Sequence, residues 1–225
     1  MNPVLILCHN AIELTKSALD SLAAQDVPIH ILAIDNHSKD GTYPALLDRG
    51  VQSYRCLSSI GVSRAWNYGL RYFFEMGEQH VLVVNNDVVL RPDTYRELLA
   101  DDGLFVTCVG VNTLEESQKQ FVKTVRPHPD FSCFLIRRKV WETIGPFDES
   151  MVLYASDADY HMRMHIAGIP AYTIGLPFYH VASGTIKYNP EEAAEIKAQA
   201  DKDRAVFVKK WGMSVGSEQY NEVFK

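Results

Sequence analysis

Short apolar runs alternate with segments of helical periodicity through the first half of the chain. Residues 4–8, 29–35 and 80–86 are short and rich in valine, isoleucine and leucine, which favours strands buried on both faces. In residues 12–24 and 62–74 the apolar side chains recur at near-helical spacing. Strands and helices that alternate through short joins predict an α/β fold, in which helices cover both faces of a parallel sheet.

Weaker signals add three elements to this half. Residues 51–57 predict a further strand. A short helix is expected to start near Tyr43, and Asp40 is well placed to cap it. Residues 92–99 predict another short helix, because Pro92 suits the first turn of a helix.

The second half is less regular. Its apolar runs predict strands at 104–111, 131–138, 171–174 and 178–181, and helices at 157–167 and 190–210. The polar stretch 112–130 contains two prolines and predicts a loop that is mobile or functional. Since no internal repeat or low-complexity linker is present, residues 1–225 are expected to form one domain.

Composition narrows the possible function classes. With 225 residues, 47% of them hydrophobic, the chain can bury one substantial core. A net charge of -6 and a pI near 5.7 argue against a broad basic surface for nucleic acid or anionic membranes. The four cysteines form no C-x-x-C pair and are expected to be reduced core residues. No apolar run is long enough to cross a bilayer, so a cytoplasmic location is expected.

The most informative stretch is HVLVVNND, residues 80–87. An apolar run that ends on two amides and a carboxylate places polar side chains at the carboxyl end of a buried strand, where α/β sheets bind ligands. Asp87 is therefore a candidate to hold a metal ion or a phosphate. The alternative is a simple turn, because Asn and Asp favour turns through local hydrogen bonds.

Eight motifs follow one another along the chain: CHNAIELTKSALDSLAAQ, IDNHSKDGT, GVSRAWNYGL, VVNNDVVLRPD, FLIRRKVWETIGPFDE, YASDADYHMR, HVASGT and VKKWG. Their order and intervals resemble those of family 2 glycosyltransferases of the GT-A fold, most closely rhamnosyltransferase-like members. The resemblance implies a Rossmann-like sheet, a nucleotide-sugar-binding half at 1–110, and an acceptor and catalytic half with a helical tail at 111–225. It also implies inverting transfer of a sugar from a nucleoside diphosphate to an acceptor, with a divalent cation, Mn²⁺ or Mg²⁺.

Two residues match metal-binding positions of that family. Asp87 matches the last acid of the Asp-x-Asp-type motif, in which Asn85 here replaces the first acid. His180 matches a position that supplies a second metal ligand or a phosphate contact. Hard divalent cations prefer oxygen ligands, and manganese also accepts imidazole. The alternative for His180 is a core or surface histidine without a ligand.

The resemblance also assigns donor-binding residues at the ends of the first, second and fourth strands and at the third helix. These are Cys8, His9, Asn10, Asp35, Arg64 and Asn86. A carboxylate such as Asp35 can accept paired hydrogen bonds from ribose hydroxyls or from the N–H groups of a base. Trp66 stands where many family members carry an arginine, which weakens the assignment of Arg64.

Inverting transfer needs a general base that takes the proton of the acceptor. Asp157 matches the second acid of the family's Glu-Asp pair, whose first acid is replaced here by Ser156. We therefore expect Asp157 to be the base and Asp159 to be structural. The alternative for either residue is a helix cap, because both lie at the start of a predicted helix.

Two further patterns have simpler explanations. His161 and His165 have the spacing of a zinc pair, but they lack the glutamate of the H-E-x-x-H motif. The charged segment 191–211 is expected to be a solvated helix that packs back on the domain. The Gln-x-x-Arg-Trp signature of processive relatives is absent, because the chain reads Lys-Lys-Trp at 209–211. This favours the addition of a single sugar.

The acceptor and two other function classes stay open. A glycan, a lipid-linked glycan or another hydroxyl compound would suit the aromatic residues Trp141 and Tyr154 and the loop 112–130, while the acidic charge disfavours modified DNA. A non-catalytic nucleotide-sugar-binding module is a second possibility, because Asn85 and Ser156 remove acids. A nucleotidyltransferase is a third, although the chain has no glycine-rich basic loop near its N-terminus.

Overall fold

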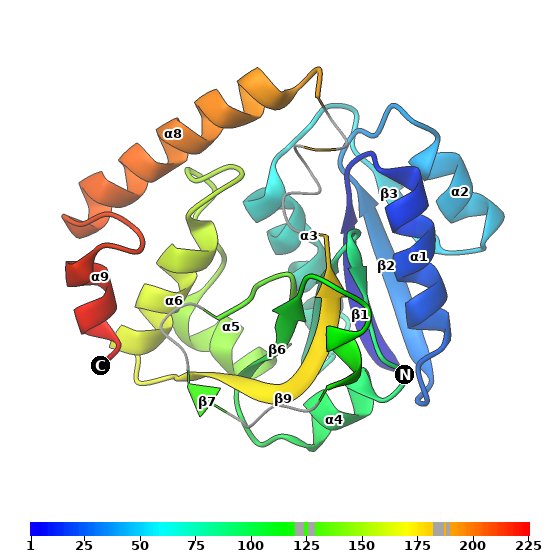
Figure 1. Cartoon of the computed structure of the whole chain (residues 1–225), viewed down its shortest axis with the longest axis horizontal. Coiled ribbons are helices and arrows are strands. Elements are labelled where there is room, and N and C mark those ends of the chain that lie inside the picture. The colour runs from blue at the N-terminus through cyan, green and yellow to red at the C-terminus, as the bar shows by residue number, and fades with distance from the viewer. Residues whose placement is uncertain (120–123, 126–128, 182–186, 188–189) are drawn as a thin grey trace.

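The structure is a computed structural model that describes residues 1–119, 124–125, 129–181, 187 and 190–225 (Figure 1). Its strands are β1 (Asn2–Cys8), β2 (Ile29–Asp35), β3 (Gln52–Arg55), β4 (His80–Asn85), β5 (Val88–Val89), β6 (Phe105–Val111), β7 (Thr124–Val125), β8 (Cys133–Arg137) and β9 (Ala171–His180). Its helices are α1 (Ile12–Ala23), α2 (Thr42–Asp48), α3 (Val62–Glu75), α4 (Thr94–Ala100), η1 (Glu116–Gln118), α5 (Arg138–Ile144), α6 (Ser156–Ile166), α8 (Ala193–Trp211) and α9 (Glu218–Val223).

The strands form one mixed sheet in the order β3-β2-β1-β4-β8-β6-β9-β5, with β7 paired to β9. The four strands β3, β2, β1 and β4 are parallel, as the first half of the sequence predicts. β8 then runs antiparallel to β4 and to β6, whereas β6 and β9 are parallel. The predicted α/β fold is confirmed, and the sheet is mixed because β8 pairs antiparallel with β4 and β6, and β5 and β7 pair antiparallel with β9.

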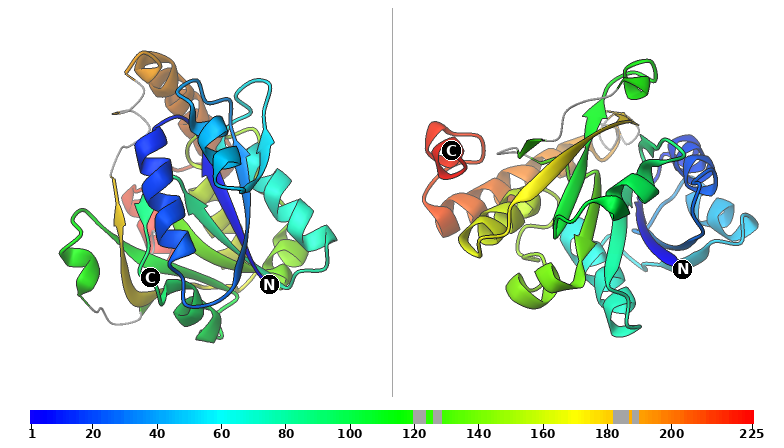
Figure 2. Two further views of the ribbon diagram at one scale, coloured as in Figure 1. Left: turned by 90° about the vertical axis from the view of Figure 1, so that its right-hand side faces the viewer. Right: turned by 90° about the horizontal axis from the view of Figure 1, so that it is seen from below.

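Helices cover both faces of this sheet (Figure 2), because successive side chains of a buried strand point to opposite sides. In β1, Val4 and Ile6 pack toward α1 and α4, and Leu5 and Leu7 pack toward α3 and the residues of α5 and α6. A third, smaller core joins α6 to α8 and α9 around Phe207. The long helix α8 thus packs back on the domain, as its apolar stripe predicts.

Several elements differ from the sequence prediction, β9 and α9 among them. Residues 171–174 and 178–181 were expected as two strands, but β9 is one strand that continues through Gly175 and Pro177. A register shift between Thr107 and Val109 of β6 accommodates this irregular stretch. The helix α9 has only a short apolar pattern, and Ser217 caps it by accepting a hydrogen bond from the backbone N–H of Tyr220.

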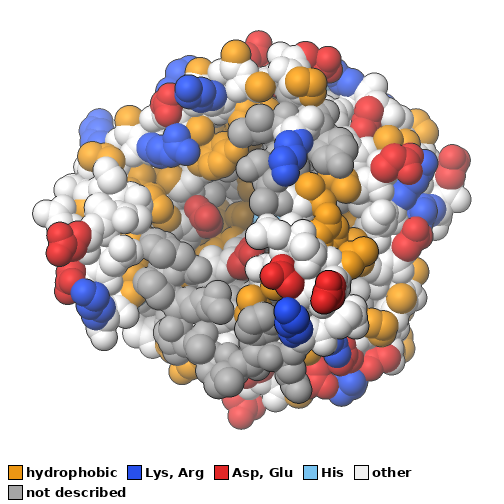
Figure 3. All heavy atoms as spheres, viewed as in Figure 1, with side chains coloured by type: hydrophobic (Ala, Val, Ile, Leu, Met, Phe, Trp, Pro, Cys, Tyr) orange, Lys and Arg blue, Asp and Glu red, His pale blue; other side chains and the backbone are white. Residues whose placement is uncertain are grey.

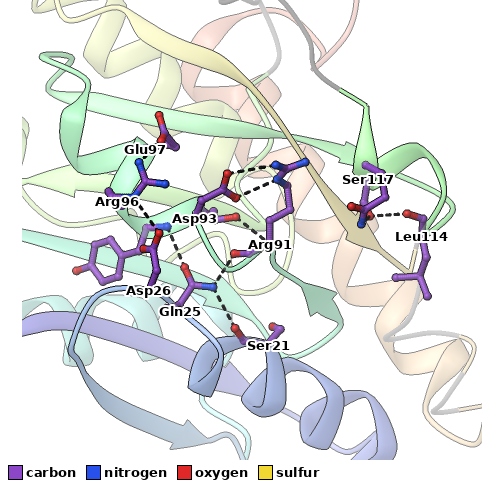
Figure 4. Close-up of polar contacts among 12 residues, drawn as sticks. Ser21, Gln25, Asp26, Arg91, Asp93, Arg96, Glu97, Leu114 and Ser117 are labelled. Carbon is purple, nitrogen blue, oxygen red and sulfur yellow. Dashed lines mark hydrogen bonds and ion pairs between the residues drawn. The ribbon is translucent and has the colours of Figure 1, made fainter.

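Polar side chains fix the loops at the carboxyl ends of the strands. The N-cap residue of α2 is Gly41, and one oxygen of Asp40, the residue before it, accepts from the backbone N–H of Thr42. The other oxygen of Asp40 accepts from the N–H of Ile12 at the start of α1. On the far side of α1, the side chain of Gln25 donates to the backbone oxygen of Arg91 and accepts from the N–H of Tyr95 (Figure 4). The segment between β5 and α4 is therefore tied to α1.

The expected loop 112–130 is only partly described. It contains η1 and β7, while 120–123 and 126–128 lie outside the described residues. Among the described residues, no helix combines the length and the apolar character that a membrane span requires.

Candidate active site

A cleft of about 640 Å³ opens at the carboxyl ends of β1, β2 and β4. Residues from the start of α3, from 152–157 before and within α6, and from α8 form its other walls. In the space-filling view this face is hollowed near its centre, and acidic side chains lie in the hollow (Figure 3). Parallel strands end at a common edge, so the sheet order alone brings their terminal polar residues to this cleft.

Asp87 and His180 meet in this cleft because β5 and β9 are paired. Val88 lies opposite His180 in the ladder, and the backbone N–H of Val181 donates to the backbone oxygen of Asp87. As a result, the Nε2 atom of His180 lies 3.5 Å from Oδ2 of Asp87. The other carboxylate oxygen of Asp87, Oδ1, is buried and has no hydrogen-bond partner within the described part of the chain.

The charges around His180 favour a positive charge at this point. Burial of the ring lowers its pKa, but the hydrogen bond with Asp87 and the charges of Asp87 and Asp130 outweigh burial, so the pKa is raised above its ordinary value. An unpartnered carboxylate oxygen beside an imidazole is a donor set that suits Mn²⁺ or Mg²⁺. The residues therefore fit the cation that the resemblance implies. Within the described residues, no group of three or more His, Cys, Asp or Glu side chains is arranged to hold a metal, so any further ligands would have to come from elsewhere.

Asp130 lines the cleft as well, and sequence reasoning missed it. It precedes β8, whose antiparallel course brings its first residues to the carboxyl end of β4. Its Oδ1 accepts from the backbone N–H of Ser132. A Cβ atom at Gly110 would lie 2.2 Å from Oδ2 of Asp130, so a larger residue there would displace this carboxylate.

Three of the predicted donor-binding residues form or support the cleft wall. His9 lines the cleft, and its two ring nitrogens bond to the backbone oxygen of Asn36 at 2.8 Å and to Glu192 at 2.9 Å. Asn86 also lines it, and its amide donates to the backbone oxygen of Asn10 and to Thr15. Asn10 shapes the neighbouring loop, since its side-chain oxygen accepts from the N–H of Lys39.

The other three predicted donor-binding residues lie outside the residues that line the cleft. Asp35 is fully buried and accepts a hydrogen bond from the backbone N–H of Ser38. Its Oδ2 lies 3.5 Å from Nε of Arg55, with which it forms an ion pair. Cys8 is fully buried too, and burial together with the charge of Asp35 raises the pKa of its thiol. Arg64 forms an exposed ion pair with Glu149 at 3.0 Å.

Glu192, just before α8, is a second residue that the sequence did not single out. Its carboxylate bonds to Lys39 at 2.8 Å and to His9, and these two hydrogen bonds lower its pKa. It joins the start of α8 to the loops after β1 and β2. This contact depends on the path of α8 past the cleft, and the local sequence pattern at 191–196 does not predict that path.

The two acids at the start of α6 have different surroundings. Asp157 lines the cleft, and its Oδ1 accepts from the backbone N–H of Ala158 at 2.8 Å. Asp159 is fully buried in the contact between α6 and α8. There it accepts from Arg163 at 2.9 Å and from the indole of Trp211 at 3.0 Å, and it pairs with Lys210 at 2.7 Å. Of the two acids, only Asp157 faces the cleft.

Comparison with known proteins bears on the family and the fold. Residues 4–102 match the family model "Glycosyl transferase family 2". The match covers the half of the chain that forms the parallel strands, and it agrees with the family 2 glycosyltransferase resemblance of the sequence motifs. The family predicted from the motifs is confirmed, whereas rhamnosyl specificity stays a prediction. No protein of curated function matches the chain significantly in sequence.

Solved structures of glycosyltransferases share the fold of this chain. The mannosyltransferase PcManGT from Pyrobaculum calidifontis, in complex with GDP-Man and Mn²⁺, has a TM-score of 0.68 and 18% identity, over 100% of this chain and 68% of that one. S. aureus TarS 1-349 has a TM-score of 0.62 and 18% identity, over 81% of this chain and 61% of that one. GalNAc-T7 with UDP, GalNAc and Mn²⁺ has a TM-score of 0.65 and 13% identity, over 80% of this chain and 43% of that one. The chain thus spans about 61% of TarS 1-349 and 43% of GalNAc-T7. The shared architecture confirms the predicted GT-A fold.

The histidine pair, His161 and His165, lies outside the residues that line the cleft. The ring of His161 stacks on Phe224 with centroids 4.0 Å apart, and His165 meets the same ring edge-on at 5.2 Å. These contacts fasten the end of the chain to α6.

Proposed function

We propose that this domain transfers a single sugar from a nucleoside-diphosphate sugar to an acceptor hydroxyl, with inversion at the anomeric carbon and with a divalent cation. The observation that carries the proposal is the buried Oδ1 of Asp87, which has no hydrogen-bond partner among the described residues and lies beside His180 in the same cleft as Asp157. A cleft of about 640 Å³ also lies within the usual range for small-molecule sites, roughly 300–1,000 Å³.

The donor is proposed to lie along the carboxyl ends of the parallel strands. His9 and Asn86 line this side of the cleft, as do Asn36, His37 and Lys39 of the loop after β2. Imidazole and amide groups suit the base and ribose, and a lysine suits a phosphate. Asn10 and Asp35 act beneath this surface by shaping the loop, since both accept hydrogen bonds from its backbone N–H groups. Two structural neighbours were solved with GDP-Man and with UDP, which supports a nucleotide donor here.

The diphosphate is proposed to lie beside Asp87 and His180. When bound there, Mn²⁺ or Mg²⁺ supplies the positive charge that stabilises the nucleoside diphosphate as it leaves. The residues' own part is to offer one carboxylate oxygen and one imidazole nitrogen from rigid, paired strands. Such fixed ligands need no rearrangement during the reaction.

Asp157 is proposed to accept the proton of the acceptor hydroxyl. The acceptor oxygen then forms a bond to the anomeric carbon while the bond from that carbon to the diphosphate oxygen breaks, and the electron pair leaves with the nucleoside diphosphate. Because attack and departure occur on opposite faces, the configuration inverts. Tyr154, which lines the cleft just before α6, offers an aromatic face to a sugar ring. We therefore favour a glycan or a lipid-linked glycan as acceptor.

A panel of UDP-, dTDP- and GDP-sugars, with Mn²⁺, with Mg²⁺ or with a chelator, tests this function. Release of a nucleoside diphosphate that requires the cation, together with NMR detection of the inverted sugar configuration, is the expected result. Donor binding without turnover would indicate a non-catalytic module. Pyrophosphate release from a nucleoside triphosphate would indicate a nucleotidyltransferase. Either result would overturn the proposal.

A further inference from the structure

The carboxylate of Asp203, on α8, binds three successive backbone N–H groups of the segment that leads into α6. Val152 donates to Oδ1 at 3.0 Å, and Leu153 and Tyr154 donate to Oδ2 at 2.7 and 2.9 Å. Asp203 itself is fully buried. Hydrogen bonds to a charged acceptor are about twice as strong as neutral ones, so this carboxylate dominates the conformation of the segment. We call residues 152–154 the acceptor-side segment.

The opposite side of the acceptor-side segment is fixed by α3. The backbone oxygen of Val152 accepts from the N–H of Val62 at 2.8 Å. A Cβ atom at Gly61 would lie 2.7 Å from that oxygen, so the glycine permits the close approach. The segment is therefore held between α3 and α8, and Figure 1 shows α8 running alongside the loop that leads into α6.

This clamp acts on the cleft directly. Val152, Leu153 and Tyr154 all line it, and Asp157 follows in the first turn of α6. Ala155 joins the two parts with a φ of 62°, a left-handed conformation in which alanine is strained. A strained joint keeps its geometry only while its neighbours are fixed. The position of Asp157 thus depends on what holds residues 152–154.

We infer that Asp203 is a positioning residue for the transfer reaction: its carboxylate holds the acceptor-side segment in the shape that presents Asp157 to the acceptor. This inference rests on the proposed function. Gln199 extends the same network to the cleft, since it lines the cleft and its amide donates to Asp203 Oδ1 at 2.8 Å. A helix outside the sheet layers thus sets the position of Asp157, the proposed general base.

Asparagine tests the charge with little change in volume. The NH₂ group of asparagine cannot accept a hydrogen bond, so Asp203→Asn leaves at least one of the three backbone N–H groups without its acceptor. Asp201→Asn is the matched control, because Asp201 lies on the same helix, is exposed, and pairs with Arg204 at 3.1 Å. Arg204 lies over the ring of Tyr154, so this variant changes the charge near the segment without removing an acceptor of its backbone N–H groups.

Hydrogen–deuterium exchange measures the clamp independently of activity. We expect Asp203→Asn to speed amide exchange of residues 152–154 by at least about tenfold, with exchange in β1 unchanged. Asp201→Asn should match the wild type throughout. Unaltered exchange at 152–154 in Asp203→Asn would overturn the inference, even if the wild type transferred no sugar at all. A wild type without turnover on any donor would instead overturn the proposed function.

Steady-state kinetics separate positioning from general stability. We expect Asp203→Asn to lower kcat by about 10²-fold while the KM for the donor stays within about twofold, because small displacements of a catalytic group have effects of this size. Asp203→Glu keeps the charge and should recover part of kcat, and it replaces Asp203→Asn if that variant does not fold. An unchanged kcat, or a loss confined to the donor KM, would contradict a positioning role.

Discussion

The Nε2 atom of His180 lies 3.5 Å from a carboxylate oxygen of Asp87. The two residues belong to distant parts of the chain, and the short ladder between β5 and β9 joins them. Because backbone pairing sets their separation, substitution of either side chain should alter the charge at this point without moving the strands. That independence makes the proposed cation site open to test.

Replacing Asp87 with asparagine should weaken Mn²⁺ binding. The variant removes the negative charge but keeps the size of the side chain, and we expect affinity for Mn²⁺ in the presence of a nucleoside diphosphate to fall by at least about tenfold. Isothermal titration calorimetry or the electron paramagnetic resonance signal of free Mn²⁺ measures it. Asp93→Asn is the control, because Asp93 pairs with Arg91 at 3.0 Å outside the cleft. Equal affinity in the two variants would count against Asp87 as a ligand.

Replacing Asp157 with asparagine should abolish transfer and leave donor binding nearly intact. Loss of a general base lowers rates by about 10²- to 10⁴-fold, and asparagine cannot take up the acceptor proton. Turnover and donor affinity are measured on the same preparation. If Asp157 only caps α6 through the N–H of Ala158, the variant will lose stability and keep its turnover.

Alanine at Gly61 should destabilise the protein more than alanine at Gly77. Both glycines have positive φ, +82° and +96°, so both substitutions introduce backbone strain. Only at Gly61 would the added Cβ meet another residue, at 2.3 Å from Val152 Cγ1. We expect Gly61→Ala to lose about 1–3 kcal/mol more of the free energy of unfolding in urea. Equal losses would show that Gly61 does not fix the acceptor-side segment.

The pair formed by Asp148 and Lys210 should make stability fall in acid. Burial alone would raise the pKa of Asp148, but hydrogen bonds from Lys210 and Ser150 lower it to about 2 from an ordinary value of 3.8. The unfolded chain therefore takes up this proton first, so the contribution is complete above about pH 4 and is lost as the pH falls toward 2. We expect Asp148→Asn to lower the free energy of unfolding by about 1 kcal/mol at pH 6, since solvent partly screens the pair.

The measurement is urea unfolding of the wild type and Asp148→Asn between pH 2 and pH 6. The gap between the two proteins should close as the pH falls. Asp201→Asn serves as the control, because its partner Arg204 is exposed and no such gap is expected. A gap that is constant across this range would mean that Lys210 does not stabilise the ionised carboxylate.

Much of the fold follows from local patterns, since the apolar runs at 4–8, 29–35 and 80–86 coincide with strands of the parallel part of the sheet. The direction of β8 was not predictable in that way, because it depends on long-range pairing with β4 and β6. Because that direction brings Asp130 to the cleft, the local sequence pattern could not predict its place there.

The candidate site was predictable to the level of strand ends, but the side chains that face the cleft were not. Asp35 and Asn36 are adjacent at the end of β2, yet Asn36 lines the cleft and Asp35 is buried under the following loop. The local pattern indicates where a strand ends, and the packing around it decides which neighbour borders the cleft. The contacts of Glu192 and Asp203 also depend on the path of α8 past the cleft, which no local signal determines.

Anomalous diffraction at the manganese edge tests the central claim most directly, with crystals grown in Mn²⁺ and a non-transferable nucleoside-diphosphate sugar. We predict one anomalous peak beside Asp87 and His180, bound by the diphosphate, with the sugar lying toward Asp157. A nucleotide sugar bound in the cleft with no peak there, or with the carboxylate of Asp87 turned away from the diphosphate, would contradict the proposed function.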